Sequence, residues 1–323
     1  MTARVGLSLV VLLAGTANLA SQQTFRATVG GVVIDVSVMS AGKPIEGLTA
    51  RDFELRDNGV LQQVDVVSAG HALLDFTILL DYAGRAAARM ARLADGLVKV
   101  VRELRPTDRL QLLACGQSVR EIVPMQLVSD RIHFDELKTL SSDPHYTSTM
   151  NDCFAEALVL RSPPDRRHAI IAFSALSAGH NVLQWHDLLM PLARTTDATL
   201  FVGAIPVAGA YPPGWFQPIG EAAAMTGGQL WLGVFPEQRE PMYVTRGRGL
   251  APIEGLVPFD DVVKALEQIV DNFRRGYVIS YTPHNIPAGG WHDVSVKVLR
   301  PSSKPYVVRA RKGYFGESAR QSP

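Results

Sequence analysis

Apolar runs of strand length alternate with amphipathic segments of helix length between residues 71 and 275. The run ALLDFTILLD, residues 72–81, is almost continuously apolar, as is typical of a strand covered on both faces of a parallel sheet. A helical pattern follows it, with apolar residues three and four positions apart. The repeated order of strand and helix predicts an α/β fold with a doubly wound, mostly parallel, Rossmann-like sheet and helices on both faces.

Continuous apolar runs and the helical spacing of apolar residues also predict the individual strands and helices of this region. After residue 81 we expect strands in DRLQLLACG, VREIVPM, HAIIAFSAL, ATLFVGAIPV and GQLWLG. We expect helices over residues 84–104, 129–140, 149–161, 181–195, 216–227 and 258–276. VREIVPM is the predicted edge strand, because its Pro124 cannot donate a hydrogen bond to a neighbouring strand.

Alternating apolar and polar residues indicate β-structure on both sides of the α/β region, in residues 24–70 and 276–316. Asp57-Asn58-Gly59 separates two such runs and predicts a tight hairpin, because Asn and Gly tolerate positive φ. Neither segment is large enough to be stable alone. We therefore expect them to pair as a small β-sandwich, with the α/β domain (residues 71–275) inserted between them and residues 317–323 as a disordered tail.

The first twenty residues have the pattern of a secretory signal peptide. The basic start MTAR precedes the apolar run VGLSLVVLLAG, which is too short to cross a membrane, and small residues follow. Cleavage after Ala17 and cleavage after Ala20 both fit this pattern. No other stretch reaches spanning length, so we expect an exported protein, periplasmic or extracellular, with no stable membrane span after cleavage.

Charge and motifs exclude several functions. Lysine and arginine total 32, and aspartate and glutamate total 31, without the clustered basic footprint of nucleic-acid-binding proteins. The sequence has no HExxH, GxSxG or P-loop motif, so hydrolase and nucleotide chemistry have little support. Asp143 and His145 are the pair to which a hydrolase would assign catalytic roles.

Cys115 and Cys153 are the only cysteines. Two cysteines without paired spacings predict neither a disulfide framework nor a zinc site. We expect two buried free thiols, one in a strand and one on a helix. A disulfide between them is the alternative, because an exported protein can form one.

Several segments resemble those of one protein family. GLTARDFELRDNGVLQQV leads into the strand TILLD, and FRRGYVISYTP, GGWHDVSVKV and RARKGYF close the chain. This order is similar to that of exported bacterial proteins, common in acidobacteria, that carry a von Willebrand factor A (VWFA) domain. The resemblance covers nearly all of the chain after the signal peptide. It implies a VWFA domain flanked by β segments.

The resemblance also implies the location of a metal-ion-dependent adhesion site. In most VWFA domains the first strand ends in Asp-x-Ser-x-Ser, and a Thr and a later Asp from other loops complete a site for Mg²⁺, a cation that prefers hard oxygen ligands. In this chain the matching positions are Asp81, Ala83 and Arg85, then Ser148 or Thr149 for the Thr, and, near the late Asp, Ala175.

These substitutions predict a degenerate site. The hydroxyls that Mg²⁺ needs are missing, and Arg85 brings a cation to the place where the metal would bind. We expect no metal and no cofactor, with an Mg²⁺ site as the alternative. Two roles stay open for Asp81: it shapes a polar recognition patch with Arg85, Ser148 and Thr149, or it is a leftover acid satisfied by Arg85 and backbone N–H groups.

The loop GAYPPGWFQP, residues 209–218, places Tyr211, Trp215 and Phe216 among prolines and glycines. Rigid aromatic side chains on loops are effective anchors for a protein partner. The alternative is that Trp215 and Phe216 pack under the sheet where the next helix begins. A second long loop, residues 239–255, is mostly polar and is expected to line the same surface.

The favoured function is therefore that of a non-enzymatic, exported module that binds an unidentified protein through loops at the carboxyl edge of the sheet, without a metal ion. The first alternative is an adhesion domain that depends on a divalent metal held by a divergent site. The second and weakest alternative is an exported hydrolase.

Overall fold

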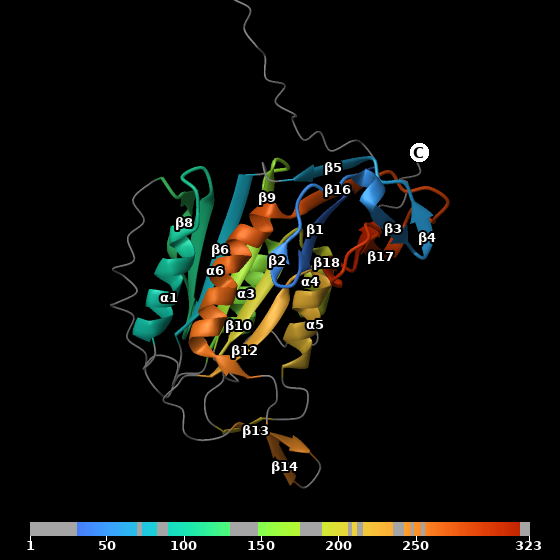
Figure 1. Ribbon diagram of the computed structural model, residues 1–323. Helices are drawn as coiled ribbons and strands as arrows, with labels where there is room; N and C mark the ends of the chain where they lie inside the picture. Colours follow the sequence, from blue (N-terminus) through green and yellow to red (C-terminus); the bar gives the residue numbers. More distant parts are fainter. Residues whose placement is uncertain are drawn as a thin grey trace, which may run out of the picture.

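The computed structural model describes residues 31–69, 73–82, 90–129, 148–174, 189–205, 209–211, 216–234, 242–246, 249–252 and 256–316. The predicted signal peptide, the predicted tail and residues 130–140 of one expected helix lie outside these ranges. The described chain forms an α/β unit with a β-sandwich beside it (Figure 1).

A seven-stranded sheet forms the centre of the α/β unit, in the order β15-β12-β10-β9-β6-β7-β8. Neighbouring strands are parallel except for the pair β7 and β8 at one edge. The strands are β6 (Leu73–Asp81), β7 (Arg109–Cys115), β8 (Val119–Leu127), β9 (Arg166–Ser174), β10 (Thr199–Ala204), β12 (Gln229–Val234) and β15 (Val257–Pro258). This order confirms the predicted doubly wound, mostly parallel sheet, and β8 is the predicted edge strand.

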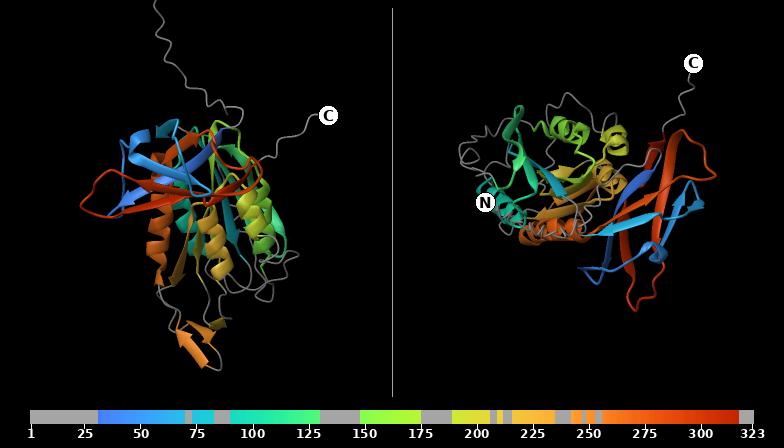
Figure 2. Two further views of the ribbon diagram at one scale, coloured as in Figure 1. Left: turned by 90° about the vertical axis from the view of Figure 1, so that its right-hand side faces the viewer. Right: turned by 90° about the horizontal axis from the view of Figure 1, so that it is seen from above.

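Helices cover both faces of this sheet, as Figure 2 shows in the view from above. Helices α1 and α6 cover one face with the apolar sides of Leu97 and Val262, and α3, α4 and α5 cover the other. The described helices are α1 (Met90–Arg102), α3 (Met150–Val159), α4 (Met190–Thr195), α5 (Gln217–Met225) and α6 (Phe259–Arg275).

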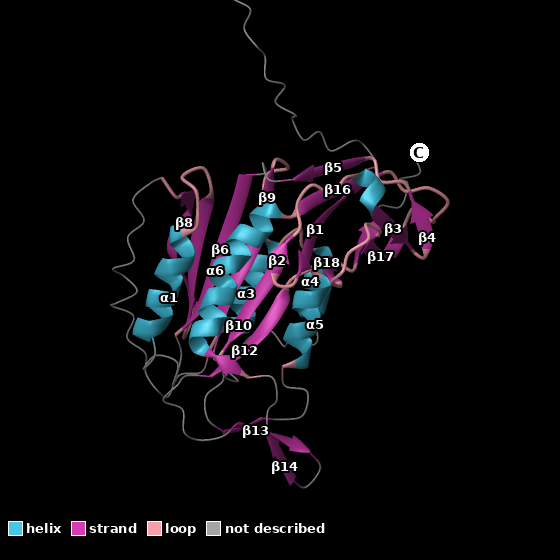
Figure 3. Cartoon of the chain, in the orientation of Figure 1, coloured by secondary structure: helices cyan, strands magenta, loops and turns pink. Residues whose placement is uncertain are grey.

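The β segments from the two ends of the chain form the sandwich, which confirms the predicted architecture. One sheet has the order β18-β1-β16-β5, with β2 also paired to β1, and the other has the order β19-β17-β3-β4. Figure 3 shows the α-helices gathered on the other unit. The sandwich contains β1 (Val32–Ser40), β2 (Lys43–Pro44), the 3-10 helix η1 (Ala50–Asp52), β3 (Phe53–Asp57), β4 (Val60–Gln62), β5 (Val66–Ala69), β16 (Tyr277–Tyr281), β17 (Gly290–Val298), β18 (Tyr306–Ala310) and β19 (Gly313–Gly316).

Two local sequence patterns in the sandwich have different outcomes. The Asn-Gly hairpin is confirmed, because Asn58 and Gly59 have φ values of 48° and 79° and join β3 to β4. The alternating run YVVRARKGYF forms two strands in different sheets rather than one. Its first half pairs with β1 as β18, and its second half pairs with β17 as β19.

The long loop predicted over residues 239–255 contains a hairpin instead. Strands β13 (Met242–Arg246) and β14 (Gly249–Pro252) are antiparallel, and β11 (Gly209–Tyr211) pairs in parallel with β13. This small sheet extends below the α/β unit in Figure 1. The segment is polar and rich in glycine, so its composition gave no signal for paired strands.

The sandwich is attached to the α/β unit by the outer face of β1. Residues of β1 alternate, so that Ile34 and Val36 enter the sandwich core while Asp35 points toward the α/β unit. Arg167, at the start of β9, donates from Nε to Asp35 Oδ1 at 2.5 Å and from Nη1 to the Phe273 carbonyl oxygen at 2.5 Å. Its side chain is only 8% exposed.

Two hydrogen bonds to backbone carbonyl oxygens complete this attachment. Lys312 N donates to the Met225 carbonyl oxygen at 2.9 Å, and Arg311 Nη2 donates to the Thr196 carbonyl oxygen at 2.7 Å. The two units therefore share hydrogen bonds from three separate parts of the α/β unit.

Among the described residues, no helix combines the length and the apolar character needed to cross a membrane.

The first prediction concerns Arg167. In Arg167→Met, the Asp35 carboxylate and the Phe273 carbonyl lose a nearly buried partner, which should lower the free energy of unfolding by about 3 kcal/mol. Urea denaturation followed by circular dichroism measures this change. The control is Arg275→Met, which removes exposed ion pairs to Asp271 and Glu46 and should change stability much less. Equal effects of the two substitutions would contradict the role assigned to Arg167.

Candidate functional site

The chain reverses its direction of winding between β6 and β9, which are neighbours in the middle of the sheet. Strands β7 and β8 lie to one side of β6, and β10 and β12 lie beyond β9 on the other side. The connections that leave β6 and β9 therefore diverge. Ligands of doubly wound proteins bind at such a switch point, outside the carboxyl ends of the strands.

Asp81 ends β6 at this switch point and is fully buried. The parallel register pairs Leu80 with Phe173, so Ser174 follows on β9 beside Asp81. Ser174 Oγ donates a hydrogen bond to Asp81 Oδ2 at 2.9 Å. The carboxylate is thus held by a neutral hydroxyl of the adjacent strand.

Ser174 was missed by the sequence analysis, which placed the matching position at Ala175. The signal that was available is the end of the apolar run HAIIAF, because the first polar residue after a buried parallel strand lies at the carboxyl edge. Only the register of β9 against β6 shows that this residue contacts Asp81.

Ser148 and Thr149 reach the same edge from the start of α3. Thr149 N donates to the Gly116 carbonyl oxygen, just after β7, at 3.0 Å. Ser148 Oγ accepts a hydrogen bond from Met150 N at 3.1 Å, which occupies this hydroxyl with the first turn of the helix. Thr149 Oγ1 is buried and has no hydrogen-bond partner within the described part of the chain.

Gly116 allows the ring of Tyr82 to pack closely against the backbone next to this loop. A Cβ atom at this position would lie 2.2 Å from the ring of Tyr82, the residue after Asp81. Tyr82 N also donates to the Cys115 carbonyl oxygen at 3.1 Å, so the strand ends of β6 and β7 stay together beyond their last paired residues.

Cys115 and Cys153 form a disulfide, which corrects the expectation of two free thiols. Cys115 is the last residue of β7, and Cys153 lies one helical turn after Thr149 and donates its N–H to the Thr149 carbonyl oxygen. Their Cα atoms are 6.1 Å apart, a separation that a disulfide can span. The bond fixes the start of α3, and with it the Ser148 and Thr149 loop, against the sheet.

Of the other predicted site residues, the structure describes Tyr211 and Phe216. Phe216 is half-buried before α5 and packs against the core under α3, α4 and α5. Tyr211 lies in β11, where its backbone is paired with Val244. The positions outside the described residues are Ala83, Arg85, Asp143, His145, Ala175 and Trp215. The pairing of Asp81 with Arg85 therefore stays a prediction.

The oxygen donors described at the carboxyl edge include the carboxylate of Asp81 and the neutral hydroxyls of Ser148, Thr149 and Ser174. Mg²⁺ sites in proteins use carboxylates in near-octahedral geometry. In the part of the chain that is described, no group of three or more His, Cys, Asp or Glu side chains could hold a metal ion.

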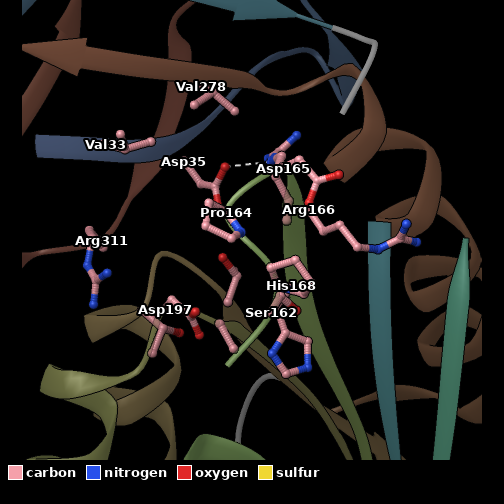
Figure 4. A pocket seen from close by; sticks show the side chains of 15 residues that line it. Val33, Asp35, Ser162, Pro164, Asp165, Arg166, His168, Asp197, Val278 and Arg311 are labelled. Carbon is pink, nitrogen blue, oxygen red and sulfur yellow. Dashed lines mark hydrogen bonds and ion pairs between the residues drawn. The ribbon is translucent and has the colours of Figure 1, made fainter. Parts of the chain in front are cut away.

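A cavity of about 250 Å³ lies at the opposite, amino-terminal edge of the sheet, next to the sandwich (Figure 4). Its wall includes Asp35 with its partner Arg167, and also His168, Asp197 and Arg311. Burial lowers the pKa of His168 and so favours the neutral imidazole. The arginines Arg167 and Arg311 of this wall already have protein partners.

The strand order defines an α/β protein with a doubly wound sheet, and Asp81 marks a candidate site at its switch point. A scan against known protein families and a search of curated proteins found no match. Among solved structures, the chain is similar to a von Willebrand factor type A protein from Catenulispora acidiphila, with 8% identity, a TM-score of 0.44, and coverage of 86% of this chain and 74% of that chain.

Two further solved structures are similar to the chain. One is BatB from Bacteroides thetaiotaomicron, with 10% identity, a TM-score of 0.41, and coverage of 62% of this chain and 98% of that chain. The other is manganese-loaded TRAP protein from Plasmodium vivax, with 13% identity, a TM-score of 0.37, and coverage of 81% of this chain and 98% of that chain. The fold assignment rests on the strand order and not on these values.

The second prediction concerns the disulfide. In the double variant Cys115→Ala, Cys153→Ala, the loss of a cross-link over 38 residues should lower the free energy of unfolding by about 3 kcal/mol. Guanidinium denaturation of the oxidised protein measures this difference. A reducing agent should destabilise the native protein and leave the double variant unchanged. Equal stability of the native protein with and without reducing agent would contradict a stabilising disulfide.

Proposed function

We propose that the chain is a non-enzymatic, exported module that binds a protein partner at the carboxyl edge of its sheet without a bridging divalent ion. The observation that carries this proposal is the state of Asp81. Its carboxylate is fully buried and accepts a hydrogen bond from Ser174, and the other site hydroxyls described at this edge, those of Ser148 and Thr149, are neutral. In this proposal the buried Asp81 carboxylate stabilises the edge of the sheet, and the surrounding loops bind the partner.

The aromatic loop supplies the binding anchors in this proposal. Phe216, which precedes α5, is half-buried and packs against the core of the α/β unit, and Trp215 is its neighbour in the sequence. An aromatic anchor on a rigid base loses little conformational entropy when it binds. Arg85, four residues after Asp81 in the sequence, is the cation that we expect to pair with an acidic side chain of the partner.

The absence of an enzymatic role is supported by the placement of the described histidines. His168 lies near the amino end of β9, and His284 and His292 lie in the sandwich. The hydroxyls at the carboxyl edge therefore have no imidazole base among the described residues, as a serine or threonine nucleophile would need.

Export is supported by the signal-peptide pattern of residues 1–20 and by the disulfide. Disulfides persist in oxidising compartments, such as the periplasm or the extracellular space, and are rare in the cytosol.

A metal-dependent adhesion domain with a divergent site is the second candidate. The observation that favours it is the buried Thr149 Oγ1, which has no hydrogen-bond partner among the described residues. A buried hydroxyl without a partner is unfavourable, and a bound group at the carboxyl edge would satisfy it.

The third prediction is a quantitative pull-down with the mature chain against the extracytoplasmic fraction of its own cells. Partner recovery should be the same in Mg²⁺ and in EDTA, because no ion bridges the contact. Trp215→Ala should lower recovery at least about tenfold, as expected for an aromatic hot spot. Arg85→Ser should lower it less. Mass spectrometry measures recovery.

The matched control for this experiment is Phe315→Ala, which removes a half-exposed aromatic side chain on the sandwich and should leave recovery unchanged. Recovery that is lost in EDTA would establish the metal-dependent alternative. Recovery that is equally reduced by Trp215→Ala and Phe315→Ala would contradict the aromatic loop as the binding surface.

A further inference from the structure

A second cavity, of about 310 Å³, lies between the sandwich and the α/β unit on the side of α6. Strands β1 and β18 of the sandwich form one wall, and β10, β12 and α6 form the other. The argument below uses the aromatic wall residues Phe201 and Trp231 and the polar wall residues Ser37, Gln229, Gln268, Asn272 and Arg309. All of them belong to the described part of the chain.

Arg309 is the one charged side chain among the described residues that line this cavity. It is partly buried, and within the described part of the chain its guanidinium makes neither a hydrogen bond nor an ion pair. Burial lowers the pKa of Arg309, and no carboxylate offsets this effect. A guanidinium that is partly removed from water without a partner is unfavourable.

The neighbouring arginines at the same junction are in a different state. Arg167 pairs with Asp35, and Arg311 donates to the carbonyl oxygens of Thr196 and Gly313 at 2.7 and 3.0 Å. The chain thus satisfies the other buried guanidinium groups of this junction and leaves Arg309 open toward the cavity. A guanidinium that lines a cavity and has no protein partner is a feature of an anion-binding site.

The aromatic and amide side chains of the cavity indicate what the uncharged part of the ligand is. Trp231 and Phe201 lie with their ring centres 6.4 Å apart and form an apolar surface in the cavity. The side-chain amides of Gln229, Gln268 and Asn272 can donate and accept hydrogen bonds around that surface. A single arginine balances a single negative charge, which favours a carboxylate over a phosphate.

We propose that this cavity binds a monocarboxylate with an apolar, aromatic body, with the carboxylate paired to Arg309 and the aromatic body against Trp231 and Phe201. The planar guanidinium matches a carboxylate through two parallel hydrogen bonds. The volume lies near the lower end of the range for small-molecule sites. The inference is independent of the proposed function, because the cavity lies on the sandwich side of the sheet and Asp81 lies at the carboxyl edge.

The fourth prediction tests the charge. Isothermal titration calorimetry of the mature chain with 3-phenylpropionate and with its neutral amide should give an affinity at least about tenfold higher for the acid, because a charge-assisted pair is lost in the amide. Arg309→Gln should abolish this preference. The control Arg51→Gln, at an exposed arginine of the sandwich, should retain it.

A second variant supplies the carboxylate within the protein. Ser37 is the cross-strand partner of Arg309 in the antiparallel pair of β1 and β18, and both line the cavity. Ser37→Asp should therefore pair with Arg309, raise the melting temperature and weaken binding of 3-phenylpropionate at least about tenfold. Because this variant is expected to be more stable than the native protein, loss of binding is not explained by unfolding.

Peptides distinguish the source of the carboxylate. A short peptide that ends in a free phenylalanine carboxylate and its C-terminally amidated form are titrated in the same way. Tighter binding of the free-acid peptide than of 3-phenylpropionate supports the C-terminus of a protein as the ligand, and the reverse order supports a free small acid. Both results support the carboxylate site.

Three results would overturn the proposal. They are equal binding, or no binding, of the acid and the amide by the native chain; an acid preference that survives in Arg309→Gln; and tighter binding of phenyl phosphate than of 3-phenylpropionate.

Discussion

The parallel pairing of β6 with β9 determines where this protein can present a site. The two strands are in register from Leu73 with Arg166 to Leu80 with Phe173, and the winding of the chain reverses between them. The pairing brings the side chains that follow these strands together at one edge. It explains why an acid at the end of one apolar run contacts a hydroxyl at the end of another, 93 residues later. The disulfide then holds α3 against this edge from the neighbouring strand.

The β-sandwich depends on the same sheet through its opposite edge. Arg167 begins β9 and pairs with Asp35 of β1, so the strand that carries Ser174 at one end holds the sandwich at the other. The outer face of the sandwich sheet covers the amino ends of the parallel strands and encloses two cavities. One of them contains the ion pair of Asp35 with Arg167, and in the other Arg309 has no partner among the described residues. The proposed recognition site at the carboxyl edge and the proposed ligand site at the sandwich thus lie at opposite ends of one sheet.

The sequence predicted the parts of the fold that depend on short-range pattern. Apolar runs located the parallel strands, and Asn58-Gly59 located the hairpin, because periodicity and turn chemistry are local. The sequence left the disulfide as the less favoured alternative, and it did not predict the contact of Ser174 with Asp81 or the β13–β14 hairpin. These features depend on register and on pairing between distant segments, which composition does not encode. The state of Arg309, which has no partner among the described residues, is of the same kind, since it depends on which distant segments pack around it.

The central claim is that the carboxyl edge recognises its partner without a divalent ion, and direct observation of metal at Asp81 tests it. Crystals of the mature protein are soaked in Mn²⁺, and an anomalous difference map is calculated at the manganese edge. The account predicts no anomalous peak in contact with the Asp81 carboxylate. A well-resolved peak that is coordinated by Asp81, alone or together with Ser148, Thr149 or Ser174, would contradict it.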